Sequence, residues 1–210
     1  MNLKKEQIEK IKDYYIRHGH KIQEYNLFAV RNLEGLRDDI FNDCIGYWKN
    51  DMTGNVYVGT TDPGKASIQH GGIPGTGAPF LCSGYHEDIF CIGPHGKEAY
   101  EAFVNRSYKG CKRQRIIRDK NRNFKFDVDE KISFGWFSIN LHRASRIKDV
   151  DVIGPYSEGC SVVRHAADHM EMITTAKKTD MYLKNPLPTL FSYMIFELPE
   201  MNDIYDMVIK

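Results

Sequence analysis

The spacing of apolar residues changes early in the chain, and this change limits the possible folds more than any other feature. In residues 3–18, Ile8, Ile11 and Tyr15 recur three and four positions apart between charged residues, which predicts an amphipathic helix. Over residues 25–142 the apolar runs are short, rich in aromatic and β-branched residues, and separated by Gly- and Pro-containing turns. That second pattern is typical of strands. We therefore expect a mainly β fold of the α+β class.

The same change indicates how the chain is organised. We expect residues 1–24 to be a separable N-terminal helix or extension and residues 25–210 to form one domain, because 210 residues are enough for a single core. Within that domain the expected elements are strands at 55–58, 115–118, 132–141 and 190–198, a short helix at 98–104 and a longer helix at 161–176.

Charge and cysteine content narrow the class of protein. The 29 basic and 28 acidic residues leave a net charge of +1, which does not favour a nucleic-acid partner. The N-terminus is charged rather than signal-like, and no apolar run approaches the ~20 residues of a membrane span. Five cysteines without a regular framework favour reduced thiols. We expect a protein made in the cytoplasm without a signal peptide and with no transmembrane segment.

The candidate catalytic residues lie in one segment of the sequence, between His142 and Cys160. His142 ends an expected strand, and Cys160 lies where a Gly-containing turn enters the expected helix at 161–176. A helix N-terminus favours a thiolate, and an imidazole beside it would complete a Cys–His nucleophile pair. Gly159 allows close approach of a substrate, and the N–H groups of 158–160 could form an oxyanion hole. Taken alone, a single cysteine and a single histidine are also typical of structural positions.

The spacing of these residues matches a known pattern. His142 is followed by 14 residues and then by Ser157-Glu158-Gly159-Cys160, and this arrangement resembles the signature of the L,D-transpeptidase catalytic domain. Glu158 stands where that family usually has histidine, so the sequence resembles a divergent, phage-type branch. The resemblance implies an L,D-transpeptidase-like β-sandwich or barrel with an N-terminal helix and a helix after the cysteine.

The resemblance also implies a role for each site residue. Cys160 would be the nucleophile, His142 its base, and the backbone carbonyl of Arg143 would orient the imidazole. Ser157 would brace the catalytic turn, and Gly159 and Cys160 would supply oxyanion N–H groups. The expected contacts to substrate are Ser157, Asn140 on the segment leading to the histidine, and Tyr85 and His95 on loops able to line a cleft.

By this resemblance the substrate is a peptidoglycan stem peptide. Cys160 would attack the carbonyl of the L-centre of a diamino acid and release a D-residue, after which an amine or water would resolve the acyl-enzyme. No cofactor is implied. The place of action is left open between the cell wall or periplasm and a phage particle. The alternative is a non-catalytic cell-wall-binding or virion structural module that retains the fold.

Two segments resemble parts of metal sites. His165 and His169 lie four positions apart, a half-site for zinc, but no third ligand follows, so we expect a solvent-facing pair. Residues 119–130 match several positions of a calcium-binding loop, although Phe124 stands where the sharp turn requires glycine. We therefore expect no metal site.

Overall fold

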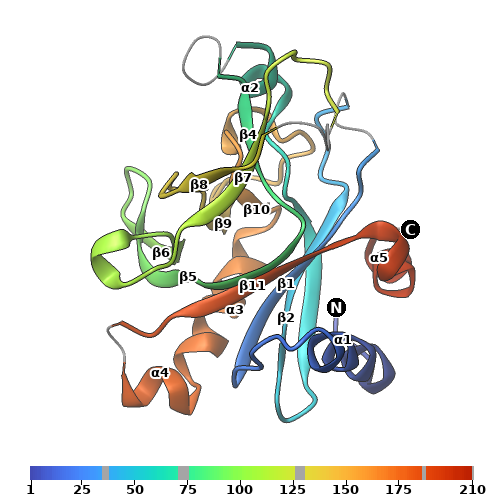
Figure 1. The fold of residues 1–210 in the computed structure, drawn as a ribbon, viewed down its shortest axis with the longest axis vertical. Helices are drawn as coiled ribbons and strands as arrows, with labels where there is room; N and C mark the ends of the chain where they lie inside the picture. The colour runs from blue at the N-terminus through green and yellow to red at the C-terminus, as the bar shows by residue number, and fades with distance from the viewer. Residues whose placement is uncertain (35–37, 71–75, 126–130, 186–187, 210) are drawn as a thin grey trace.

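The protein is built around a closed barrel of eight strands (Figure 1). The structure, a computed structural model, describes residues 1–34, 38–70, 76–125, 131–185 and 188–209. The barrel strands are β1 (Tyr25–Arg31), β2 (Asp43–Lys49), β3 (Gly54–Thr60), β5 (Gly84–His95), β6 (Tyr100–Val104), β9 (Leu141–Arg143), β10 (Ser161–Val163) and β11 (Phe191–Glu197). Their order around the barrel is β1-β11-β5-β6-β9-β10-β3-β2. The coarse expectation of a mainly β fold with a few helices is confirmed.

Two pairs of neighbouring strands run parallel, and the others run antiparallel. β1 pairs with β11 in parallel, which joins the two ends of the chain, and β9 pairs in parallel with β10. The α-helices and the remaining strands are α1 (Lys5–Arg17), α2 (Lys65–His70), α3 (Ala166–Lys177), α4 (Asp180–Lys184), α5 (Asn202–Ile209), β4 (Ala78–Leu81), β7 (Gln114–Asp119) and β8 (Ser133–Gly135). No helix in the described part of the chain is long and apolar enough to cross a membrane.

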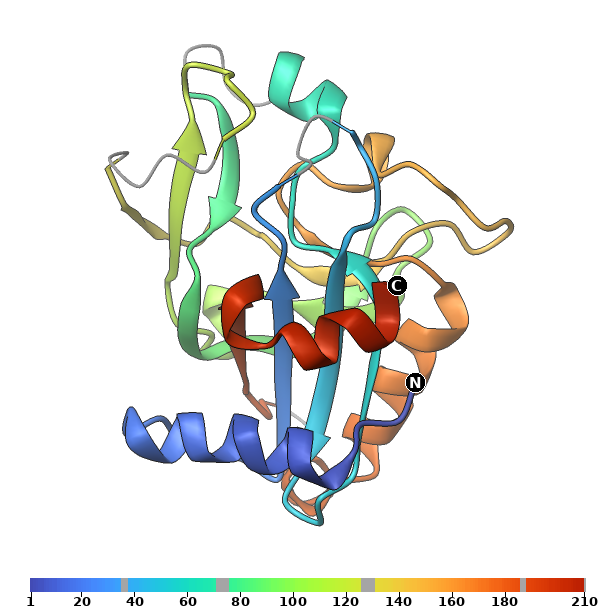
Figure 2. The ribbon, with the colours of Figure 1, turned by 90° about the vertical axis from the view of Figure 1, so that its right-hand side faces the viewer.

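Side chains that alternate along the strands pack into two separate clusters, so the core has two parts. In β1, Leu27 and Ala29 belong to a cluster with residues of α3, whereas Phe28 and Val30 belong to a second cluster with residues of α1 and α5. Successive side chains of a strand point to opposite faces, so β1 is buried on both sides. Figure 2 shows α1 and α5 lying across the outer face of β1 and β2.

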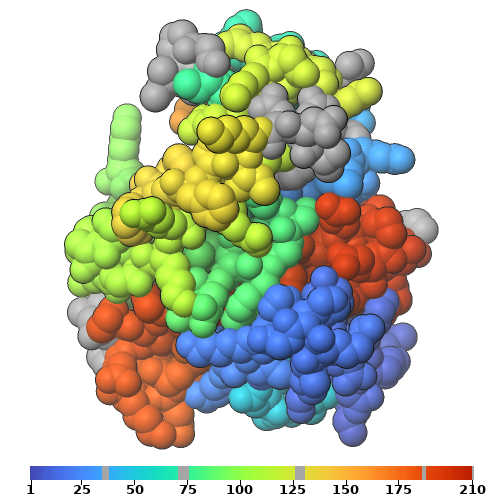
Figure 3. Space-filling view, in the orientation of Figure 1, coloured from blue at the N-terminus to red at the C-terminus, as the bar shows by residue number. Residues whose placement is uncertain are grey.

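The expectation that residues 1–24 are separable is not supported by this packing. Ile8, Ile11 and Tyr15 are wholly buried in the second cluster. The chain before the helix is also tied to β3, because the terminal ammonium of Met1 donates to the carbonyl of Val56 at 2.8 Å. In Figure 3, α1 and α5 lie side by side on the surface, and Lys10 pairs with Asp203 across them. The helix is therefore part of the core of the domain.

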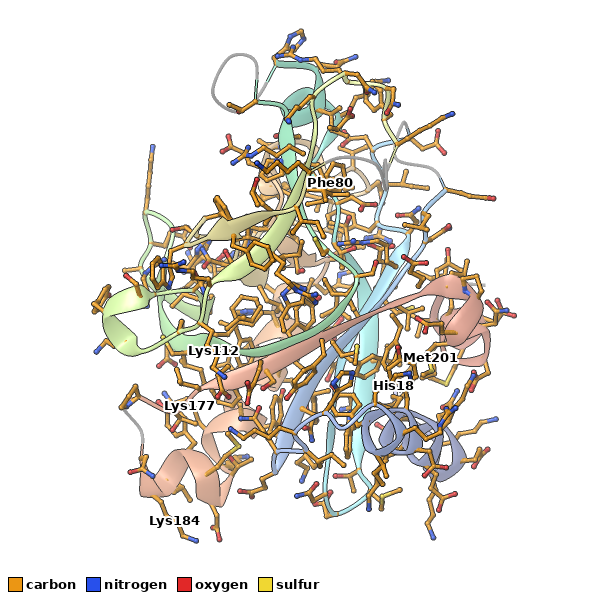
Figure 4. All side chains as sticks on the ribbon, viewed as in Figure 1. His18, Phe80, Lys112, Lys177, Lys184 and Met201 are labelled. Atoms are coloured by element: carbon orange, nitrogen blue, oxygen red, sulfur yellow. The ribbon has the colours of Figure 1, made fainter. Side chains whose placement is uncertain are left out.

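A second sheet stands at one end of the barrel, in the order β4-β7-β8. Phe80 of β4 is wholly buried there with Ile68 and Ile117 (Figure 4). The sheet is short, but it brings Pro79 of β4 against the turn that precedes β10.

Three expected elements differ in the structure. Residues 98–104 contain the strand β6 rather than a helix, and 132–141 contains only the short strand β8 and the start of β9. The helix expected at 161–176 begins at Ala166, because 161–163 form β10. A helix does follow Cys160, but a strand lies between them. Within α3, Met170 is 65 % exposed and His169 is buried.

The packing of α1 can be tested with two isoleucines of the same helix. Ile11→Ala should lower the free energy of unfolding by about 2–5 kcal/mol, because the lost methyl groups leave a cavity. Ile16 is 58 % exposed, so Ile16→Ala should change it by less than about 0.5 kcal/mol. Chemical denaturation followed by circular dichroism measures both. Equal effects of the two substitutions would contradict the packing of α1 on the barrel.

Candidate active site

The parallel pairing of β9 with β10 brings the histidine and cysteine segments together. His142 lies opposite Val162 in this pair, and the N–H of Ser161 donates to the carbonyl of Asn140 at 2.9 Å. Cys160 is the residue immediately before β10. Residues 18 positions apart in the sequence are therefore brought together where β9 pairs with β10.

His142 is held in one orientation by backbone and by a tyrosine. Its Nδ1 lies 2.8 Å from the carbonyl oxygen of Arg143. Because a carbonyl only accepts, Nδ1 carries the hydrogen and Nε2 keeps a free lone pair. The hydroxyl of Tyr100 lies 3.3 Å from Nδ1 and donates to the same carbonyl at 3.4 Å. The ring is thus the neutral tautomer that can accept a proton at Nε2.

The turn carrying Cys160 is braced by Ser157. The Ser157 hydroxyl donates to the carbonyl of Cys160 at 2.8 Å and accepts the N–H of Gly159 at 3.1 Å. Gly159 has a φ of 121°, and a Cβ there would lie 2.4 Å from the carbonyl oxygen of Pro79. Both the conformation and the contact require glycine.

One backbone donor points at the thiol, and one remains for a substrate. The N–H of Asn140 donates to Sγ of Cys160 at 3.3 Å, which stabilises negative charge on sulfur. The N–H of Gly159, expected in an oxyanion hole, is already donated to Ser157. The N–H of Cys160 makes no hydrogen bond to the described residues. Cys160 itself is therefore the better oxyanion donor of the two.

Asn140 and His95 lie beside His142 and are tied to other protein groups. The amide of Asn140 lies 3.2 Å from Nδ1 of His95, and its Oδ1 accepts the N–H of Asn105 at 2.9 Å. The His95 ring stacks on that of His142 with centroids 4.2 Å apart. These contacts help to position the His142 ring. His95 also lines the larger cavity that contains Cys160, and the expected contact of Asn140 and His95 with substrate stays a prediction.

Tyr85 is not at the site. Its hydroxyl donates to the carbonyl of Lys21 at 2.9 Å, and its ring stacks on His20 with centroids 4.5 Å apart. The residue faces the outside of β5, under the N-terminal segment. The sequence places Tyr85 near a turn but does not show which face of the strand it occupies, and the expectation was wrong on that point.

Two cavities meet at Cys160. The larger, of about 500 Å³, is also lined by His95, Tyr100, His142 and Arg143. The smaller, of about 330 Å³, is lined by residues of the second sheet and its surroundings, including Pro79, Arg118 and Phe137. Glu158 lines both cavities together with Cys160. A substrate could therefore approach the thiol from either side, past this exposed carboxylate.

Tyr100 is the residue that sequence reasoning missed. It was placed in an expected helix, whereas β6 presents Tyr100, Ala102 and Val104 on one face. The alternation of these three positions is the signal that could have found it. Besides its contact with His142, the Tyr100 ring lies beneath the guanidinium of Arg143, 4.0 Å from its central carbon.

Burial, which is only partial for the Cys160 side chain, favours the neutral forms of the thiol and of the imidazole. Burial raises the pKa of Cys160 to about 11, against the Asn140 N–H that lowers it, and Glu158 raises it further. Burial, with His95 nearby, lowers the pKa of His142 to about 3. A lowered thiol pKa was expected from a helix N-terminus that the structure does not place at Cys160. Within the described residues, no hydrogen bond joins the two side chains.

Of the two segments that resemble parts of metal sites, only the one with His165 and His169 lies wholly within the described residues. His165 contacts Asp149 at 2.8 Å, whereas His169 is buried, so the pair is not jointly solvent-facing as expected. Residues 126–130 of the calcium-like segment lie outside the described residues, and its first residue, Asp119, is the last residue of the strand β7. Among the described residues no group of three or more His, Cys, Asp or Glu side chains could hold a metal ion.

Comparison with known proteins identifies no relative. No family model matches the chain, and no curated protein or solved structure matches it. The functional interpretation therefore depends on the geometry of the site and on the resemblance of its motif.

The electrostatics of the thiol can be measured by alkylation with iodoacetamide. The rate at Cys160 should rise with pH through a midpoint above the ~8.5 of a free thiol, because burial disfavours the thiolate. Glu158→Gln should move this midpoint down, since it removes a negative charge beside the sulfur, and should speed alkylation at pH 8 about twofold to tenfold.

The remote substitution Glu9→Gln on α1 is the matched control and should change neither value. High salt should reduce the difference between Glu158→Gln and the parent protein, because the carboxylate is exposed. A parent midpoint below 8, or no effect of Glu158→Gln at low salt, would contradict this description of the thiol.

The glycine requirement can be separated into its two causes. Gly159→Ala adds both an unfavourable φ and a contact with Pro79, whereas Gly19→Ala adds only the φ of 65°, with no atom within 4 Å. We expect Gly19→Ala to cost about 1 kcal/mol and Gly159→Ala clearly more than about 2 kcal/mol in unfolding free energy. Similar losses in the two variants would show that Pro79 does not hold the turn that carries Cys160.

Proposed function

We propose that the protein is a cysteine acyltransferase or hydrolase that cleaves L,D-peptide bonds in peptidoglycan stem peptides. The observation that carries this proposal is the junction of two cavities at Cys160, where the thiol shares one cavity with an imidazole whose Nε2 has no hydrogen-bond partner among the described residues. The spacing of His142 and the Ser157–Cys160 turn supports the substrate class through its resemblance to the L,D-transpeptidase catalytic domain.

The proposed reaction has two stages. Nε2 of His142 takes the thiol proton as Sγ of Cys160 attacks the carbonyl carbon of the L-centre. The carbonyl oxygen becomes an oxyanion that accepts the N–H of Cys160. The carbon–nitrogen bond then breaks, and the amine of the D-residue leaves with the proton from His142. An incoming amine or water gives its proton to Nε2 and attacks the thioester carbon. The carbon–sulfur bond then breaks, and the proton on Nε2 passes to the sulfur, which restores the Cys160 thiol and the neutral imidazole.

Cys160 and His142 are both neutral before substrate binds, and this affects the order of the proton transfer and the attack. With a thiol pKa of about 11 and an imidazole pKa of about 3, an ion pair is disfavoured before substrate binds. Proton transfer is therefore coupled to the attack on the carbonyl. A substrate in the cavity would complete the contact between the two side chains, since catalytic hydrogen bonds often tighten only in the complex.

One observation favours the alternative, a non-catalytic wall-binding or virion structural module. The raised pKa of the Cys160 thiol leaves little thiolate at neutral pH, as at an unreactive buried cysteine. Such a module would bind peptidoglycan without changing it, so the two functions are distinguished by the products formed.

Incubation with purified muropeptides, followed by mass analysis of the products, tests the reaction. We expect loss of the terminal D-residue or its exchange for another amine. Cys160→Ala should abolish this turnover, and His142→Ala should slow it about 10²–10⁴-fold, as loss of a general base commonly does.

Cys44→Ala is the matched control, because Cys44 is buried in the outer cluster, away from the cavities. It should keep the turnover per folded molecule. Full activity of Cys160→Ala would overturn the mechanism, and binding of muropeptides without any product would favour the non-catalytic module.

A further inference from the structure

A third cavity continues the catalytic cavity along α3. It has a volume of about 800 Å³, within the range of ligand pockets. Glu98, Tyr100, Arg143 and Arg146 line both this cavity and the one that contains Cys160. The two cavities are therefore neighbouring parts of one groove, which we call the α3 groove where it leaves the catalytic cavity.

One side of α3 forms the floor of the α3 groove and is exposed to solvent. Ala167, Met170, Thr174 and Lys178 recur at intervals of three and four positions, so they lie on one helix face. Met170 is 65 % exposed and gives this face of the helix an apolar surface. Alanine leaves room for a chain to lie close to the helix.

The charges along the groove are only partly balanced. Arg143 pairs with Glu98 at 2.7 Å, and Lys177 pairs with Glu101 at 2.8 Å. Figure 4 shows Lys177 on the side of the molecule away from His18 and Met201. Arg146 and Lys178 also line the groove and make no ion pair with the described residues. The groove thus has a net positive charge of about two.

A buried histidine adds a polar atom to the lining. His169 of α3 lines the α3 groove and is 2 % exposed, and its Nε2 has no hydrogen-bond partner among the described residues. A buried polar atom without a partner is costly, and a bound ligand is one way to satisfy it.

We propose that the α3 groove binds the arm of the acyl-donor peptide on the amino side of the scissile bond, an acidic segment with small side chains. This inference rests on the proposed function. The volume of about 800 Å³ suits several residues, whereas the cavity of about 330 Å³ beyond Cys160 suits the single departing residue. Carboxylates of the arm pair with Arg146 and Lys178, and its small side chains lie on Ala167 and Met170. Binding there holds the donor in place while the leaving group is exchanged for the acceptor.

Binding can be measured without turnover in the full-length Cys160→Ala protein. The probes are a fluorescently labelled synthetic stem tetrapeptide with a free glutamyl carboxylate and the corresponding carboxamide, followed by anisotropy. The Cys160→Ala parent should bind the carboxylate about fivefold more tightly. Arg146→Gln combined with Lys178→Gln should remove this preference, whereas Lys184→Gln on α4, labelled in Figure 4, should keep it.

A second substitution tests whether the peptide occupies the α3 groove, because a larger side chain there would leave less room for it. Ala167→Trp in the Cys160→Ala protein should weaken binding of both peptides at least tenfold, whereas Leu183→Trp, at an exposed position of α4, should not. In a protein that retains Cys160, Ala167→Trp should leave the rate of iodoacetamide alkylation within about twofold of the parent, which shows an intact catalytic cavity.

The outcomes separate this inference from the proposed function. If the parent binds and turns over stem peptides, but Ala167→Trp and the double glutamine variant bind both probes like the parent, the inference is overturned and the function stands. If the parent binds neither probe and yields no product from muropeptides, the proposed function fails and the inference with it. Weaker binding confined to the groove variants supports the inference.

Discussion

The parallel pairing of β9 with β10 is the interaction on which the rest of the structure depends. It closes the barrel between β6 and β3 through two strands of only three residues each. The same pairing places His142 beside the turn of Cys160, and the bond from Ser161 N–H to Asn140 sets their register. The same pairing therefore closes the barrel and brings the site residues together. A change that breaks this pairing should damage both the fold and the site.

Burial where β9 and β10 meet determines the protonation states of His142 and Cys160. His95 and Tyr100 pack around His142, so the imidazole is oriented by neutral groups and kept uncharged. The thiol is neutral for the same reason, although the Asn140 N–H points at it. With both groups neutral, little of the Cys160 thiol is present as the thiolate at neutral pH.

Sequence patterns predicted elements whose periodicity extends over many residues, such as the N-terminal helix and the strand β11. They failed where an apolar run was too short to show a period: Val162 and Val163 fit a helix and a strand equally well, and they belong to β10. Because of that error, we expected the positive end of a helix dipole at Cys160 and did not predict that His169 is buried. The places of the Tyr100 and Tyr85 side chains depend on which face of each strand points inward. A single sequence does not show that face near a turn. The motif spacing nevertheless brought out His142 and Cys160, which the fold places at one cavity.

Intact-mass analysis of the protein during its reaction with a stem peptide tests the central claim most directly. Rapid acid quenching should trap a thioester on Cys160 whose added mass equals the peptide without its leaving D-residue. Peptide mapping should assign the adduct to Cys160, and His142→Ala should accumulate it more slowly. A protein whose Cys160 is alkylated by iodoacetamide but carries no peptide adduct at any time point would contradict the proposed acyl-enzyme.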